Sequence, residues 1–194
     1  EILAHYEKAL GCAKKTKDKY LTGNALDWLA FACDWNAMGI EDPDKMVEIL
    51  QRALQYAKDA QRQFSSITFV SPRGGAFWTG APHAEHYLSL AYLETDLRKR
   101  RDLLGKSVME GTRGVKLAEI TGYPEIIWTE HHILSKALGY LAQIETNSEE
   151  KERLLEKALE HRNESIKITD QLIPFAYWER GVTRNYLADL KAEL

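Results

Sequence analysis

Apolar residues recur along most of the chain at alternating steps of three and four residues, which is the spacing of one face of an α-helix. The clearest stripe consists of Met46, Leu50, Ala53, Ala57, Ala60 and Phe64. Similar stripes run through 104–118 and 154–172, and a shorter one runs through 6–20. The alternation that marks a β-strand is nearly absent, since its one short candidate lies at 67–70. The pattern predicts an all-α protein.

Residues suited to capping mark where these helices begin and end. Asp42-Pro43-Asp44 combines a cap with a first-turn proline, and Asn147 is followed by the first-turn acids Glu149 and Glu150. Gly122-Tyr123-Pro124 ends one helix and opens the next. Apart from the long connection 65–80, the turns are short, which favours antiparallel packing of consecutive helices. We predict about eight helices, at 1–20, 24–39, 44–64, 81–96, 97–119, 124–145, 148–172 and 174–194.

Four of the five tryptophans lie 50 residues apart, at Trp28, Trp78, Trp128 and Trp178. A fixed period of this length is typical of a helical repeat protein, in which each repeat packs on the next. We interpret three of the four as packing anchors. Trp78 precedes Pro82 and falls in the long connection, so it is the tryptophan that we single out as a candidate for function.

A second set of similar segments tests this period. Each segment centres on a small residue that would allow close helix approach, and these residues are Ala9, Ala53, Ser107 and Ala158. Their spacings are 44, 54 and 51 residues rather than 50. The repeat is therefore irregular, and its turns absorb the variation.

The chain resembles the tetratricopeptide-repeat (TPR) family, whose units are a helix A, a turn and a helix B. Met38-Gly39 and Leu138-Gly139 are similar to the Leu-Gly pair of the family's helix A. Ala53, with Ala57 and Ala60, is similar to the small and apolar positions of helix B. The resemblance implies one domain over 1–194, built as a right-handed α-solenoid of antiparallel helical hairpins. Family units have about 34 residues, so these are lengthened, and HEAT-type repeats stay open as an alternative.

In the TPR family the A helices line a concave groove that binds peptides. Carried over at steps of 50, the resemblance implies one groove column of Asn36, His86, Lys136 and Tyr186, and a second of Cys33, His83, Ile133 and Thr183. Tyr140 is a further groove candidate. Asn36 and Lys136 resemble groups that clamp a peptide carboxylate in some members, but a complete clamp is not formed. We therefore expect a mixed groove for a protein or peptide ligand, and a role as an interaction scaffold.

Both ends of the chain look like half repeats. Residues 1–20 resemble a helix B without its helix A, and 174–194 a helix A without its helix B. The first residue is Glu1, so we expect a fragment of a larger protein. Tyr186, Leu187 and Leu190 would leave an apolar stripe at the end, which predicts cover by further repeats or by self-association.

A histidine cluster carries the alternative hypothesis. His83, His86, His131 and His132 lie on two neighbouring A helices. An all-α catalytic or ligand-binding domain would gather these imidazoles in one pocket beneath residues 65–80, whereas a scaffold would leave them at different depths. The sequence has no His-Glu-x-x-His segment and no assembled nucleophile, base and acid. We expect no enzyme, no metal site and no cofactor.

Charge and hydropathy limit the classes of partner that we expect. The formal net charge of −3 does not favour a polyanion, and the basic run at 98–101 fans around more than one helix face, so we do not expect nucleic-acid binding. No apolar run approaches about 20 residues, and no signal segment opens the chain, so we expect no membrane partner and a cytoplasmic location. A removed leader would leave the compartment open.

Two cysteines flank the turn predicted at 21–24. Cys12 and Cys33 are placed so that they would face each other across the first helical hairpin. Two cysteines are too few for a disulfide-stapled fold, and we interpret both as small buried side chains.

Overall fold

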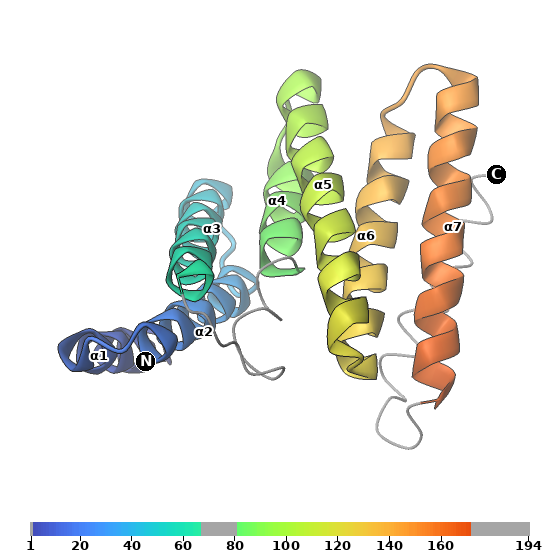
Figure 1. Ribbon diagram of the computed structural model, residues 1–194. Helices are drawn as coiled ribbons and strands as arrows, with labels where there is room; N and C mark the ends of the chain where they lie inside the picture. Colours follow the sequence, from blue (N-terminus) through green and yellow to red (C-terminus); the bar gives the residue numbers. More distant parts are fainter. Residues whose placement is uncertain (1, 67–80, 172–194) are drawn as a thin grey trace.

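The chain folds into a row of helices in the computed structural model, which describes residues 2–66 and 81–171. Seven helices follow one another there: α1 (Ile2–Thr16), α2 (Lys19–Ala37), α3 (Pro43–Ser65), α4 (Ala81–Leu93), α5 (Leu97–Thr121), α6 (Pro124–Gln143) and α7 (Ser148–Gln171) (Figure 1). These ranges contain no strand, so the all-α prediction is confirmed for them. The predicted strand candidate at 67–70, helix 174–194 and its apolar stripe lie outside the described residues.

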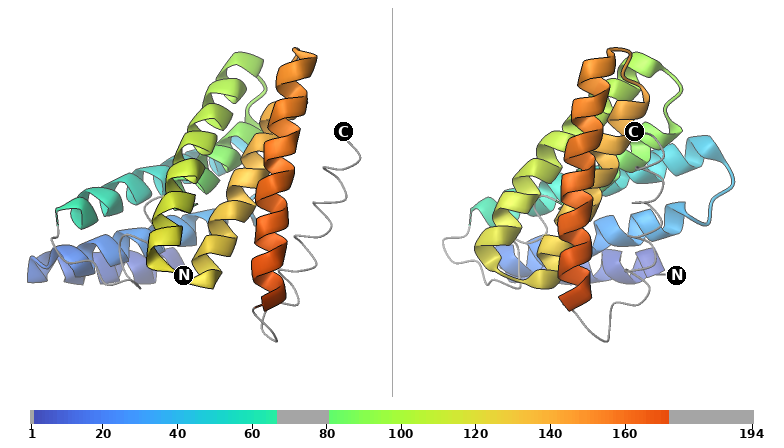
Figure 2. Two further views of the ribbon diagram at one scale, coloured as in Figure 1. Left: turned by 45° about the vertical axis from the view of Figure 1, so that its right-hand side comes forward. Right: turned by 90° about the vertical axis from the view of Figure 1, so that its right-hand side faces the viewer.

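Each helix packs against the next along the chain, and α4 also contacts both α2 and α6. Helices α4 to α7 run alongside one another, whereas α1 to α3 lie across them (Figures 1 and 2). Small apolar clusters hold successive helices together, for example Leu134 and Leu138 of α6 with Leu154 and Leu155 of α7. The contacts make α2, α4 and α6 a continuous set, which we call the α2–α4–α6 row.

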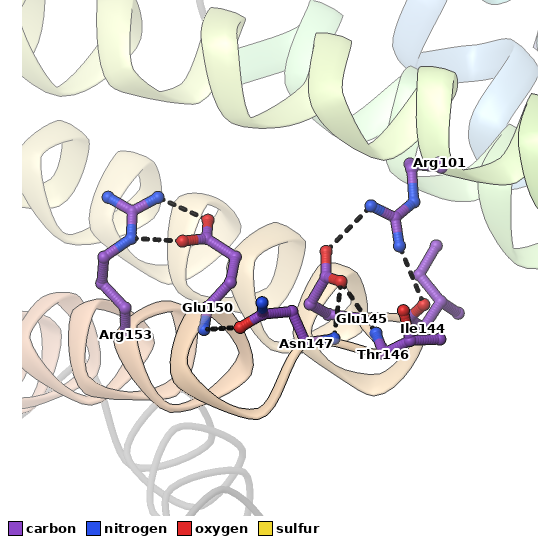
Figure 3. Close-up of polar contacts among 7 residues, drawn as sticks. All are labelled: Arg101, Ile144, Glu145, Thr146, Asn147, Glu150 and Arg153. Atoms are coloured by element: carbon purple, nitrogen blue, oxygen red, sulfur yellow. Dashed lines mark hydrogen bonds and ion pairs between the residues drawn. The ribbon is translucent and has the colours of Figure 1, made fainter.

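The capping residues act as predicted. Asp42 accepts hydrogen bonds from the backbone N–H of Asp44 and Lys45, with Pro43 in the first turn of α3. Gly122 ends α5 with a φ of 69°, a left-handed conformation that glycine adopts without a steric penalty. The Asn147 side chain accepts from the N–H of Glu150 at 3.0 Å and begins α7 (Figure 3).

The basic run at 98–101 contributes a contact to the turn between α6 and α7. Arg101 of α5 donates to Glu145 Oε2 at 2.8 Å and to the Ile144 carbonyl at 3.1 Å (Figure 3). The other carboxylate oxygen of Glu145 accepts from the N–H groups of Thr146 and Asn147. Arg101 therefore connects α5 to the turn between α6 and α7, so it is not simply a solvated side chain.

The predicted first turn is wrong. Residues 21–24 lie inside α2, and the chain turns earlier, at Lys17 with a φ of 59°. Asp18 then caps α2 by accepting from the N–H groups of Tyr20 and Leu21. Gly23 lies within this segment and serves packing, because a Cβ there would lie 2.6 Å from the Phe64 ring of α3.

We expect Gly23→Ala to lower the free energy of unfolding. Phe64 is buried and must move to admit a methyl group, which costs about 1–3 kcal/mol and outweighs a helix-propensity gain of about 1 kcal/mol. Gly11→Ala in α1 is the matched control, because nothing lies within 4 Å of its Cβ position. Urea unfolding of both variants measures the effect, and equal stability of the two would contradict the close packing of α2 on α3.

Six small residues with no exposed surface define the register of the repeat. Ser107 Oγ of α5 donates to the Ala84 carbonyl of α4 at 2.7 Å, and Ser135 Oγ of α6 donates to the Ala158 carbonyl of α7 at 2.8 Å. Both pairs are 23 residues apart, and so are Ala30 and Ala53 on α2 and α3. All six residues are 0% exposed. Equivalent residues therefore follow at steps of 54 and then 51 residues on both series of helices.

This register corrects the tryptophan period. Trp28 and Trp128 are not equivalent, because Trp28 lies two residues before the small residue of its helix and Trp128 lies seven before. Trp28 is 46% exposed and stacks on Tyr6, so it is not a buried anchor. Trp78 and Trp178 lie outside the described residues.

Two other expectations at the first hairpin also fail. Ala9 is exposed rather than packed at a close helix contact. Cys33 is buried as predicted, but Cys12 is exposed, and both thiols are free.

Candidate functional site

Two hollows lie along the α2–α4–α6 row. The larger, of about 860 Å³, lies between α1 and α2, and we call it the aromatic pocket because Tyr6, Trp28, Phe31 and Trp35 line it. The smaller, of about 340 Å³, is the central pocket, lined from α2, α3, α4 and α6. Its apolar lining includes Met38, Met46, Leu50, Leu88 and Leu93. Its polar lining is Asp34, Glu85, Ser89, His132, Lys136 and Tyr140.

Equivalent positions of the repeat face these pockets. The residues one position after the small residues of α2, α4 and α6 are Phe31, Glu85 and Lys136. The residues five positions after them are Trp35, Ser89 and Tyr140. The two residues of α2 line the aromatic pocket, and the four residues of α4 and α6 line the central pocket. Each helix of the row therefore presents repeat-related positions to one of the two pockets.

A buried acid–imidazole pair joins α2 to α4 beside the central pocket. His86 Nδ1 lies 2.9 Å from Asp34 Oδ1 and 2.8 Å from Oδ2. A carboxylate can only accept hydrogen bonds, so the imidazole proton in this pair is carried by Nδ1. Both side chains are buried, which makes the pair a positioning element for the pocket wall.

Glu85 and Lys136 face the pocket from neighbouring helices, and each is close to a group of its own charge. Burial and the carboxylate of Asp34 raise the pKa of Glu85, against the opposing effect of His86 and Lys136. Burial lowers the pKa of Lys136, Glu85 opposes this, and Arg162 adds to it. The α2 and α4 side of the pocket is thus acidic, and the α6 side is basic.

His132 is a neutral acceptor in this site. Burial, then the charges of Arg162 and Lys136, lowers the His132 pKa to about 3. Its Nδ1 accepts a hydrogen bond from Nη1 of Arg162, which has no exposed surface. Trp128 lies beside the His132 ring at 5.6 Å between centroids. The imidazole therefore connects α6 to α7 and carries no charge near neutral pH.

The four clustered histidines have four different partners. His83 Nδ1 lies 3.9 Å from Glu110 Oε2 of α5, and this imidazole lowers the pKa of Glu110. His131 Nδ1 lies 2.9 Å from Nδ1 of His161 on α7, and burial lowers the pKa of both. Among the four, His132 alone lines the central pocket. The imidazoles of this part of the chain therefore do not converge on one pocket.

Some of the predicted groove residues line a pocket, whereas others are buried against neighbouring helices or lie outside the described residues. Lys136 and Tyr140 line the central pocket, Ile133 lines it from a buried position, and Asn36 lines the aromatic pocket. Cys33, His83 and His86 are buried, and the two histidines contact other helices, which opposes direct contact of these residues with a ligand. Thr183 and Tyr186 lie outside the described residues.

Sequence reasoning missed Phe31, Trp35, Glu85 and Ser89. A signal for them was present, because the small residues Ala53, Ser107 and Ala158 already have the steps of 54 and 51. Applying that register to the A helices, instead of a step of 50, moves the groove columns from His86 to Glu85 and from Asn36 to Phe31.

Within 2–66 and 81–171, no group of three or more His, Cys, Asp or Glu residues is placed to hold a metal ion. None of the helices in those ranges combines the length and apolar character needed to cross a membrane. The chain matches no protein-family model and none of the curated proteins with which it was compared.

Proposed function

We propose that the chain is a protein-interaction module, a TPR-like α-solenoid of antiparallel hairpins that binds a peptide along the α2–α4–α6 row. The observation that carries the proposal is the shared register of the two pockets. Six side chains at equivalent positions of the alternate helices α2, α4 and α6 line them, α1 and α3 add further lining residues, and α5 and α7 contribute none. A groove lined by alternate helices is how helical repeat proteins present an extended binding surface.

The composition of the row also favours a peptide ligand. Trp35, Met38 and Tyr92 are exposed there, and aromatic and methionine side chains are enriched in protein interfaces. Polar groups from Asp34, Glu85 and Lys136 stand beside these apolar side chains and would fix the orientation of a ligand.

The rival function, a catalytic or ligand-binding all-α domain that uses the four histidines, is disfavoured by their separate partners. The rival needs His83, His86, His131 and His132 around one enclosed space. Three of them contact helices away from the central pocket or form its wall from behind. We propose no catalytic step.

We expect Ser89→Trp to weaken peptide binding by at least about tenfold, because the indole would fill the central pocket. Peptides are first selected on the wild-type chain from a displayed random library, and their affinities are then measured by calorimetry. Thr112→Trp is the matched control, since Thr112 is exposed on α5 and lines neither pocket. Circular dichroism checks that both variants fold. Failure to select any peptide, or equal affinities for Ser89→Trp and Thr112→Trp, would overturn the proposal.

A further inference from the structure

We propose that the aromatic pocket binds an amphipathic α-helix of a partner, which presents a small residue, a leucine and a large apolar residue at positions i, i+4 and i+7. This inference rests on the proposed function and adds the conformation and the apolar pattern of the peptide at one of the two pockets. It follows from the way in which successive helices of the α2–α4–α6 row pack on each other.

The helices of the row meet through the same repeat positions at both of their interfaces. The residue two positions after the small residue of the later helix meets the residue four positions after the small residue of the earlier helix. His86 of α4 meets Asp34 of α2 in this way. Ala137 of α6 and Leu88 of α4 share an apolar cluster in the same way. The pairing is therefore independent of whether its side chains are polar or apolar.

A second pairing lies near the ends of these helices. Leu93 and Ile144 each lie nine positions after the small residue of the later helix. They share apolar clusters with Ala37 and Ala91, which lie seven positions after the small residue of the earlier helix. Both interfaces of the row thus agree at this position as well.

A third pairing is made where α6 packs on α4. Ile133, two positions before the small residue of α6, packs on Ala84, which is the small residue of α4. The earlier helix therefore offers its small residue and the residues four and seven positions after it. These three positions form one stripe on the face of a helix.

The aromatic pocket marks the corresponding place on α2. The residues two positions before, two after and nine after the small residue of α2 are Trp28, Ala32 and Gly39. All three line the aromatic pocket. Among the described residues, only those of α1, α2 and the turn after α2 line it, so no described helix takes the place there that α4 takes on α6. The pocket therefore corresponds to the site of one more helix.

Positions that are covered on α6 are open on α2. Trp28 is 46% exposed, whereas Ile133 at the equivalent position is 5% exposed. Trp35 is 71% exposed, whereas the equivalent Tyr140 is half-buried and packs against an apolar cluster of α4, α5 and α6. A helix bound in the pocket would remove this aromatic surface from water, which is the main source of affinity at such a site.

Differences between α2 and α6 specify the side chains of the partner helix. Trp28 is larger than Ile133, so the residue that faces it must be small. Ala32 matches the alanine of α6, so a leucine fits opposite it as it does on α4. Gly39 replaces Ile144, and a Cβ at Gly39 would have one atom within 4 Å, at 3.8 Å. This space admits a large apolar residue at the third position.

The test uses blocked, fluorescently labelled helical peptides of about five turns and anisotropy with the whole chain. The stripe peptide carries alanine, leucine and phenylalanine at i, i+4 and i+7 in a host of glutamate, glutamine and lysine. One control peptide has the same three residues at consecutive positions, about 100° apart around the helix. A second control keeps the stripe but has a proline between the leucine and the phenylalanine, which breaks the helix. We expect the stripe peptide to bind about tenfold tighter than either control.

Two variants place the bound helix in the aromatic pocket. Gly39→Trp fills the third position and should weaken binding of the stripe peptide by at least about tenfold. Gly105→Trp in α5 is the matched control, because Gly105 is exposed, lines neither pocket and has nothing within 4 Å of its Cβ position. Trp35→Ala removes exposed aromatic surface only and should weaken binding by about tenfold. Circular dichroism checks folding, and if Gly39→Trp does not fold, Trp35→Ala decides.

The outcomes separate the two proposals. Equal binding of the stripe peptide and either control peptide overturns the helical pattern, and so does unchanged affinity in the folded pocket variants. Binding of library-selected peptides without binding of the stripe peptide also overturns it and leaves the proposed function intact. A dimer of the free chain in sedimentation that Gly39→Trp abolishes would assign the pocket to a second copy and overturn the partner helix. If no peptide of either origin binds, the proposed function itself fails.

Discussion

Replacing Asp34 by alanine is expected to lower the free energy of unfolding by about 1–3 kcal/mol. The carboxylate accepts the hydrogen bond of the His86 imidazole, and its loss leaves that buried Nδ1–H without its acceptor. Because the pair joins α2 to α4, the loss should also loosen the wall of the central pocket.

The control for this prediction is an ion pair of similar geometry at the surface. Asp102 accepts from Lys106 at 2.6 Å, and both side chains are exposed. We expect Asp102→Ala to cost less than about 1 kcal/mol because solvent screens that pair. Asp34→Asn, which keeps one acceptor oxygen, should fall between the two. Equal urea midpoints for Asp34→Ala and Asp102→Ala would show that the buried pair does not join the two helices.

Acidification is expected to destabilise the wild-type chain through His132. Its pKa is about 3 in the folded chain and about 6.5 when unfolded, so below pH 6.5 the unfolded state binds the extra proton. The contribution to stability is complete above about pH 6.5 and falls by about 1.4 kcal/mol for each pH unit below it, until the folded pKa is reached.

The matched variant is His132→Gln, whose amide oxygen can still accept from Arg162 but does not titrate. Urea unfolding at about pH 7.5 and about pH 5 should show a smaller pH-dependent loss for this variant than for the wild type. Identical pH dependence of the wild type and His132→Gln would contradict a neutral, buried His132.

The helical character of the chain could be predicted well, because it depends on local periodicity. The stripe from Met46 to Phe64 is the face that α3 buries, as the pattern indicated. Caps such as Asp42 and Asn147 act within a few residues of themselves, so their effect is also local. The first turn was misplaced, and the segment predicted for it contains Gly23. A glycine can permit a turn or a close helix contact, and the sequence alone does not distinguish them.

The site was less predictable because it depends on register and on non-local pairs. Trp28 is exposed and Trp128 is partly buried, so their rings do not mark one buried position of the repeat, whereas the steps of 54 and 51 are those of fully buried small residues. Asp34 and His86 are 52 residues apart, and no local pattern joins them. Buried small residues are therefore a better guide to repeat register than large aromatic ones, which also serve at surfaces.

The central claim, that a peptide binds along the α2–α4–α6 row, is tested most directly by amide chemical-shift mapping of the whole chain with a library-selected peptide. The account predicts the largest shifts at Phe31, Trp35, Glu85, Ser89, Lys136 and Tyr140 and in their helical neighbours. Residues on the exposed faces of α5 and α7 should shift little. Shifts confined to α5 and α7, with the row unchanged, would contradict the account.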